Sequence, residues 1–270
     1  MVFHNINVEN ETIARLGTSC LQLFIINNHA HFANKEWESI SQLIVYLFKH
    51  TTANKLFLNF QHLKTIEAPS PMSPNSEDGD LLLFQQVISQ CVLQLLLIHV
   101  IDDVLKVDGM MERIELQHLV MMCDCLESSW EFAHKFNEDE TLRYNLWKAG
   151  FMKQRPNLHK QETTSIMCLI NILLRIAKQH AEIEERCGHV IERLITTYLT
   201  IEQNSERKGK NAVKPAIELV LDYFIGSDEA LFDRIGKNMY KSFVLIARME
   251  SDDIMRSKVC DVLDRYMIYL

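Results

Sequence analysis

The sequence predicts an all-α protein, and more specifically a HEAT- or armadillo-like helical-repeat solenoid of antiparallel helix pairs. Apolar residues recur at intervals of three and four along most of the chain, which is the spacing of one face of an α-helix. No segment shows the alternation that is typical of a half-buried strand. The 270 residues include 8 glycines and 5 prolines, too few for the many turns of a sandwich or barrel. With 47% apolar and 24% charged residues, the composition is that of an ordered globular protein.

The first two predicted helices lie before residue 60. Asn10 is a suitable N-cap for a helix that carries Ile13, Leu21 and Phe24 on one face. A second helix begins near Asn34 and carries Trp37 and other apolar residues at helical spacing. These helices are predicted to form an N-terminal helical hairpin over residues 1–60.

The composition changes after this hairpin. Residues 61–80 contain three of the five prolines and are predicted to form a flexible Pro/Ser-rich linker or loop. Residues 81–270 are predicted to form a HEAT-like helical array, whose first helix runs from about residue 81 to 106. Further helices restart after breaks at Asp108-Gly109, Pro156-Asn157, Gly226-Ser227-Asp228 and Ser251-Asp252-Asp253. Because no repeat is visible at residue level, a globular helical bundle is the alternative.

Residues 81–101 contain no Asp, Glu, Lys or Arg, so the segment is long and apolar enough to be tested as a membrane span. Gln86, Gln90 and Gln94 recur every fourth residue and form one polar stripe on a helix. Amides in hydrocarbon would be costly. We therefore expect a buried helix of the array rather than a transmembrane span.

Charge and cysteine usage bound the class of protein. The formal net charge of -8 lacks the electrostatic footprint of a nucleic-acid binder, so no nucleic-acid partner is expected. The seven cysteines form an odd, scattered set among apolar residues, which indicates reduced thiols in a cytosolic protein. Residues 1–10 lack a basic region followed by an apolar stretch, so a secretory signal is not expected.

The sequence carries no convincing catalytic, cofactor or metal motif. Cys123-Asp124-Cys125 lacks a second pair of ligands and has core spacing, and His29-Ala30-His31 falls in a predicted turn. Residues 103–115 resemble a calcium loop only in part, because Val104 and Lys106 stand where oxygen ligands belong. Neither a phosphate-binding glycine loop nor a nucleophile elbow is present. We predict no catalytic residue, no metal site and no cofactor.

One stretch is a candidate for partner binding. Residues 148–160 include several basic residues and His159, and no acid follows until Glu162. Trp147 precedes this stretch and Phe151 lies within it. Such a loop can meet an acidic GTPase face or anionic lipid headgroups. The alternative is a solvated loop whose aromatic residues anchor it to the core. The candidate partner-binding residues are Trp147, Lys148, Lys153, Arg155 and Lys160.

Four blocks of sequence, in order, are similar to one protein family. They read DCLES at residues 124–128, FAHKFN at 132–137, LWKAGF at 146–151 and PNLHKQET at 156–163. Together they resemble the C-terminal region of the brefeldin A-inhibited (Sec-seven type) large Arf guanine-nucleotide exchange factors, and residues 14–21 resemble the start of that region. The sequence departs from the family in a loop at 152–155 that is one residue shorter, in His159 where leucine is usual, and in the Pro/Ser-rich linker.

The resemblance implies a HEAT-like tail of a trans-Golgi Arf activator. In that family a separate helical domain performs nucleotide exchange, and these residues show no match to it, so the resemblance implies a non-catalytic segment. It implies small GTPases of the Arf, Arl or Rab classes, or sister domains, as partners, and a cytoplasmic location peripheral on trans-Golgi network membranes. Contact with anionic Golgi membrane and homodimerisation are left open. The alternative function is a stand-alone helical adaptor with no linked exchange domain.

Overall fold

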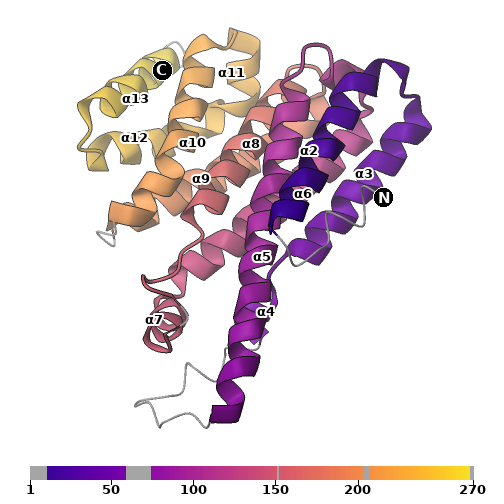
Figure 1. Ribbon diagram of the computed structural model, residues 1–270. Helices are drawn as coiled ribbons and strands as arrows, with labels where there is room; N and C mark the ends of the chain where they lie inside the picture. The colour runs from indigo at the N-terminus through magenta and orange to yellow at the C-terminus, as the bar shows by residue number, and fades with distance from the viewer. Residues whose placement is uncertain (1–10, 59–73, 151, 204–206, 268–270) are drawn as a thin grey trace. The chain divides into compact units, whose positions relative to one another are not determined.

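The computed structural model describes residues 11–58, 74–150, 152–203 and 207–267, and within these ranges every regular element is a helix (Figure 1). This confirms the predicted all-α class. The chain divides into two compact units, Met1–Ser165 and Ile166–Leu270. The boundary falls inside helix α8 (His159–Ala177).

The first unit is built around one long helix, α5 (Pro74–Leu105), which packs against four others. The remaining elements of this unit are α2 (Glu11–Asn28), η1 (His29–His31), α3 (Asn34–Thr51), α4 (Lys55–Leu58), η3 (Met111–Arg113), α6 (Leu116–Glu138) and α7 (Glu140–Lys148), followed by the start of α8. Within the part of the chain that the structure describes, the main packing partners of α5 are α2, α3, α4 and α6. Leu97, Ile98 and Ile101 of α5 are almost fully buried.

The glutamine stripe of α5 serves helix packing. Gln94 is buried, and its side-chain oxygen accepts a hydrogen bond of 2.6 Å from the hydroxyl of Thr51, at the end of α3. Gln90 donates to the backbone carbonyl of His50 over 3.3 Å. Within the described residues, Leu83–Leu105 has the length and composition of a membrane span, which is also true of core helices in folded proteins. The helix packs against its neighbours and bonds to the end of α3, and 44% of its apolar window is buried, so the predicted buried helix is only partly buried.

The boundaries near α5 differ from the expected ones. The helix begins at Pro74, whereas the predicted linker extended to residue 80. Proline is favoured at the first helical position because it has no N–H to lose there, so this proline starts the helix rather than belonging to a loop. Residues 59–73 of the predicted linker lie outside the described residues. The division into a hairpin over 1–60, a linker over 61–80 and an array over 81–270 stays a prediction.

The second unit contains the rest of α8 and a set of packed helices. These are η4 (Ala181–Ile183), α9 (Glu184–Gln203), α10 (Arg207–Gly226), α11 (Glu229–Ile235), η5 (Lys237–Met239), α12 (Tyr240–Met249) and α13 (Asp253–Tyr266). α9 packs on α10, and α12 packs on α13. The ring of Phe224 lies edge-on to the rings of Phe232 and Phe243, with centroids 5.7 and 5.8 Å apart. Edge-on pairs add to the stability that burial of the rings provides.

A buried carboxylate ties the turn before α13 to α9. Glu250 is 1% exposed and accepts hydrogen bonds from the hydroxyl of Tyr198 and, over 2.8 Å, from the backbone N–H of Asp252. Tyr198 is itself fully buried in α9. The buried carboxylate therefore fixes the connection between α12 and α13.

We expect Tyr198→Phe to destabilise the fold, because it removes a donor to a buried carboxylate while keeping the ring. The loss should be about 1–3 kcal/mol, the cost of leaving such an acceptor unsatisfied. Urea denaturation followed by circular dichroism measures it. Tyr240→Phe makes the same chemical change on a half-exposed ring and should cost less than about 0.5 kcal/mol. Equal losses in the two variants would contradict this account.

Candidate partner-binding loop and groove

The five residues of the predicted binding loop come from three neighbouring segments and are all exposed. Trp147 and Lys148 end α7, Lys153 and Arg155 lie in the connection to α8, and Lys160 lies in the first turn of α8. The structure therefore places all four cations where a partner can reach them. Phe151 lies outside the described residues.

The aromatic residues at the end of α7 form an exposed cluster. The rings of Tyr144 and Trp147 have centroids 5.9 Å apart, and the guanidinium carbon of Arg155 lies 5.6 Å from the Tyr144 ring centre. The side chain of Trp147 remains 42% exposed, so it does not anchor the loop in the core. Among the described residues of the connection, Pro156 is the buried one. A cation over an aromatic face is an attractive arrangement that also orders the loop.

Asn137, near the end of α6, holds the connection before α8 in place. Its side-chain oxygen accepts from the backbone N–H of Leu158 over 2.7 Å, and its amide nitrogen donates to Glu162 over 2.5 Å. Arg143 of α7 donates to two backbone carbonyls, those of Pro156 at 2.8 Å and Asn137 at 2.5 Å. These bonds join α6, α7 and the start of α8 and thereby fix the loop between them.

Glu162 is the buried end of this network. It is 2% exposed, and His134 Nδ1 lies 2.7 Å from its other carboxylate oxygen. Burial by itself would raise the pKa of Glu162. Hydrogen bonds from His134 and Asn137, the nearby His159 at 3.6 Å, and the charge of His134 when protonated together lower that pKa to about 2. The buried acid is therefore ionised at neutral pH.

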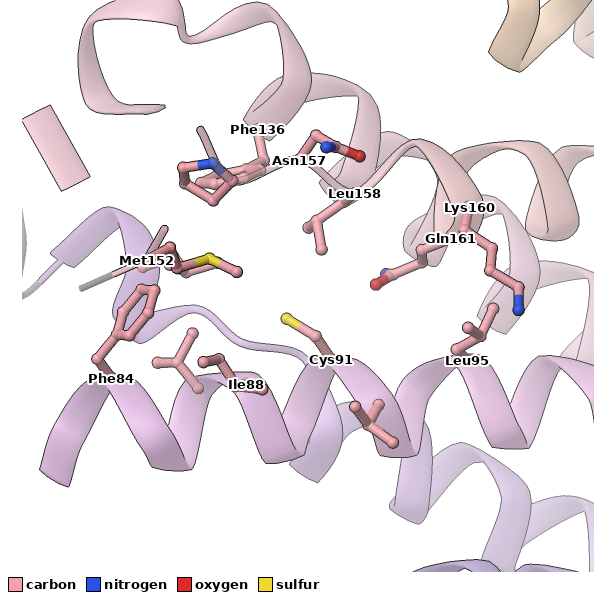
Figure 2. A pocket seen from close by; sticks show the side chains of 14 residues that line it. Phe84, Ile88, Cys91, Leu95, Phe136, Met152, Asn157, Leu158, Lys160 and Gln161 are labelled. Atoms are coloured by element: carbon pink, nitrogen blue, oxygen red, sulfur yellow. The ribbon is translucent and has the colours of Figure 1, made fainter. Parts of the chain in front are cut away.

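An apolar groove runs beside this loop, between α5 and the start of α8 (Figure 2). Its volume is about 240 Å³. Apolar side chains make up most of the lining, and Figure 2 shows Cys91 and Gln161 reaching into the space from opposite walls. The lining residues are Leu56, Phe84, Val87, Ile88, Cys91, Val92, Leu95, Phe136, Met152, Pro156, Asn157, Leu158, Lys160 and Gln161.

The groove can bind apolar groups, but its thiol is not suited to nucleophilic chemistry. Burial among apolar side chains raises the pKa of Cys91 to about 12, so the thiol stays protonated and neutral at physiological pH. Over the described ranges, His, Cys, Asp and Glu form no group of three or more that could hold a metal ion. Cys123 and Cys125 are buried in α6, and His29-Ala30-His31 forms the short helical turn η1.

The sequence pointed to the loop but not to the network or the groove. The similar blocks at 132–137 and 156–163 contain both halves of the network, yet nothing in the sequence pairs Asn137 with Glu162. The groove depends on which face of α5 is left uncovered beside the loop. For the groove, the sequence offered one signal. The long apolar helix predicted from about residue 81 is followed later in the chain by a break at Pro156-Asn157.

The fold and the site together define an all-helical protein with a partly exposed apolar groove and a hydrogen-bonded basic loop. Comparison with known families then identifies it: a family model described as "BIG2 C-terminal domain" matches residues 92–264, and the chain belongs to this family. The match begins within α5 and includes the loop and its network. The resemblance to the C-terminal region of large Arf exchange factors is confirmed.

Curated relatives agree with this family. The chain is 28% identical over 294 residues to the ADP-ribosylation factor guanine nucleotide-exchange factor sec72 of Schizosaccharomyces pombe, covering 95% of the chain and 16% of that protein. It is 26% identical over 286 residues to human brefeldin A-inhibited guanine nucleotide-exchange protein 1, covering 74% of the chain and 15% of that protein. The exchange factor SEC7 of Saccharomyces cerevisiae is 24% identical over 76% of the chain and 15% of its own length. The chain thus spans about one-sixth of these relatives. No solved structure matches.

We expect Glu162→Gln to destabilise the chain at neutral pH. The Asn137 amide is fixed by the Leu158 N–H, so its NH₂ group would face an uncharged and partly mismatched amide. The loss should be about 2–3 kcal/mol by urea denaturation. Glu138→Gln is a matched control, because Glu138 also lies near His134, at 3.3 Å, but its side chain is 60% exposed. That control should cost less than about 0.5 kcal/mol, and similar losses for both variants would refute the proposed role of Glu162.

The Glu162 carboxylate should also make the stability of the chain depend on pH in the acid range. Its pKa is about 2 in the folded chain against an ordinary value of 4.5, so its contribution is complete above about pH 5 and is lost as the pH falls towards 2. The contribution is on the order of 3 kcal/mol. Unfolding free energies of wild type and Glu162→Gln, measured between pH 7 and pH 3, should therefore converge as the pH falls. A difference in unfolding free energy that stays the same from pH 7 to pH 3 would contradict the lowered pKa of Glu162.

Proposed function

We propose that this chain is a non-catalytic regulatory and targeting segment of a large Arf guanine-nucleotide exchange factor. In this role it binds small GTPases of the Arf, Arl or Rab classes, or other domains of the same exchange factor. Such binding controls when the exchange domain meets Arf during vesicle-mediated transport at the trans-Golgi network. The match to a C-terminal domain, together with relatives that are named as Arf exchange factors, supports the proposal.

The observation that carries the binding role is the exposed basic loop after α7. Lys148, Lys153, Arg155 and Lys160 are exposed in a chain whose formal net charge is -8, and hydrogen bonds from Asn137 and Arg143 hold the loop. A local basic surface on an acidic protein attracts acidic partners while the net charge disfavours unspecific contact with nucleic acid. The ordered loop loses less conformational entropy on binding than a mobile one.

The proposal includes a HEAT-like arrangement of the helices. Its support is that sequential helices pack on one another within the second unit, as α9 does on α10 and α12 on α13. In such an array each helix pair contacts its neighbours and leaves extended surfaces for partners. We also propose a cytoplasmic location, peripheral on trans-Golgi membranes, with the basic loop free to contact anionic headgroups.

A pull-down with nucleotide-loaded GTPases tests the binding role. The immobilised chain is offered Arf, Arl and Rab GTPases and, separately, the other tail domains of the parent exchange factor. We expect at least one to bind, and replacing Lys148, Lys153 and Arg155 by Glu to weaken that binding at least about tenfold, since charge reversal opposes an acidic face. The matched control replaces Lys35, Lys241 and Arg248, which are also exposed, by Glu and should retain binding.

Two outcomes would contradict the proposal. The first is that wild-type chain binds none of the GTPases or tail domains. The second is that the isolated chain accelerates nucleotide release from Arf in a fluorescence assay, which a non-catalytic segment should not do.

A further inference from the structure

The groove between α5 and α8 contains a buried polar atom that has no partner among the described residues. The amide nitrogen of Gln161 donates to the hydroxyl of Ser129 over 3.0 Å and lies 3.4 Å from its backbone carbonyl. A carbonyl only accepts, so this contact fixes which end of the amide carries the NH₂ group. The side-chain oxygen of Gln161 is left without a hydrogen-bond donor, although the residue is 4% exposed. An unsatisfied buried acceptor is costly and favours a ligand that supplies a donor.

The wall of the groove opposite Gln161 has the shape of a helix-binding surface. Phe84, Ile88, Cys91 and Leu95 follow one another along a single stripe of α5 (Figure 2). Phe84 is buried, so the accessible part of the stripe runs from Ile88 to Leu95. At 1.5 Å per residue this part is about 10 Å long, which matches about two turns of a partner helix. Ile88 is 40% exposed, and Met152 on the other side is 39% exposed. Both apolar side chains line the groove and are accessible to a partner that enters it.

The charge beside the groove selects the partner. Lys160 lines the groove and is exposed, and Arg155 and Lys153 lie in the connection that ends at the groove residues Pro156 and Leu158. Glu162, the acid nearest in sequence, is buried with its own hydrogen-bond partners. An acidic partner therefore meets Lys160 at the groove, with Lys153 and Arg155 in the adjoining connection, and no exposed carboxylate from the start of α8 competes.

We propose that the groove binds an acidic amphipathic helix of a partner protein. Its apolar residues pack between α5 and Met152, its acidic residues face Lys160 and Arg155, and an anchor with a side-chain N–H, such as tryptophan, donates to Gln161. Beyond its first turn a helix needs a side-chain donor for this contact, because its backbone N–H groups there are already bonded. The oxygen is covered in the present conformation, so a donor reaches it only when a covering side chain moves aside.

The unpaired acceptor also distinguishes a protein partner from a lipid. The basic rim and the apolar lining would suit an anionic lipid, but an acyl chain carries no donor and would leave Gln161 unsatisfied. A tryptophan fills an apolar groove and supplies an indole N–H at the same time, which is why it is common at the centres of protein interfaces. The inference rests on the proposed partner-binding function and specifies the chemistry of one partner.

Peptide display tests the inference on the whole chain. Random peptides of about 15 residues, long enough for three to four helical turns, are displayed on phage, selected on wild type and counter-selected on Ile88→Gln. We expect the enriched sequences to be acidic, with aromatic and aliphatic residues at helical spacing. Fluorescence anisotropy with synthetic copies should show binding weakened about tenfold or more by Ile88→Gln and by Lys160→Glu.

Matched variants separate the groove from general effects. Ile225→Gln changes an isoleucine that is also 40% exposed, and Lys241→Glu reverses another exposed lysine; both should leave affinity within about twofold. Gln161→Met removes both the unpaired oxygen and the NH₂ group that donates to Ser129. Ser129→Ala removes only the hydroxyl that accepts from this NH₂ group and leaves the unpaired oxygen in place. Peptide affinity should fall in Gln161→Met and persist in Ser129→Ala, with thermal denaturation confirming that both variants are folded.

Several results would overturn the inference. The inference is wrong if no peptide is enriched, if the enriched peptides are basic, or if Ile88→Gln leaves the peptide affinity unchanged. Flotation with phosphatidylserine vesicles that depends on Ile88, without peptide binding, would assign the groove to lipid instead. A concentration-dependent dimer that Ile88→Gln abolishes would assign it to a second copy. If no peptide is selected and Ile88→Gln still binds a GTPase or tail domain, the proposed helix binding in the groove is wrong, while the proposed function stands.

Discussion

Placing a carboxylate in the interior requires hydrogen-bond donors for its oxygens, and this requirement organises the loop region of the first unit. Glu162 is buried in the first turns of α8, where water cannot solvate its charge. His134 and Asn137, one helical turn apart on α6, contact one oxygen each. Because the side-chain oxygen of Asn137 also accepts from the N–H of Leu158, the side chain that stabilises the acid sets the path of the chain into α8. The positions of Lys153, Arg155 and the adjoining rim depend on that path.

The groove follows from how α5 is used by its neighbours. α5 packs against α2, α3, α4 and α6, and its glutamines bond to the end of α3. The remaining stripe of α5 faces the irregular segment before α8, which lacks a helix's continuous side-chain surface and leaves space between Ile88 and Met152. The network that holds this segment therefore also positions one wall of the groove. Lys160 and Gln161 line the groove, and the next residue, Glu162, belongs to the supporting network.

Electrostatics and family membership favour the same role for this surface. The chain is acidic overall, yet the exposed charged residues between α7 and α8, Lys153 and Arg155, are both basic, and a local basic surface of this kind suits the proposed acidic partner. A segment that spans about one-sixth of its exchange-factor relatives and matches a C-terminal domain is suited to regulation through contacts. The neutral thiol of Cys91 and the paired carboxylate of Glu162 are consistent with binding, since neither is poised as a nucleophile or base.

The sequence by itself determined the all-α class, the long apolar helix α5 and the basic character of the loop before α8, because helical periodicity, scarce glycine and clustered charge are local properties of the chain. It misplaced the start of α5 at residue 81, since Pro74 suits a first helical turn as well as a loop. Only the tertiary structure decided that Glu162 is buried, because an acid in a first helical turn is equally favourable in solvent. Its pairing with Asn137, 25 residues away, and the unpaired oxygen of Gln161 depend on how three segments meet in space, which no local pattern encodes.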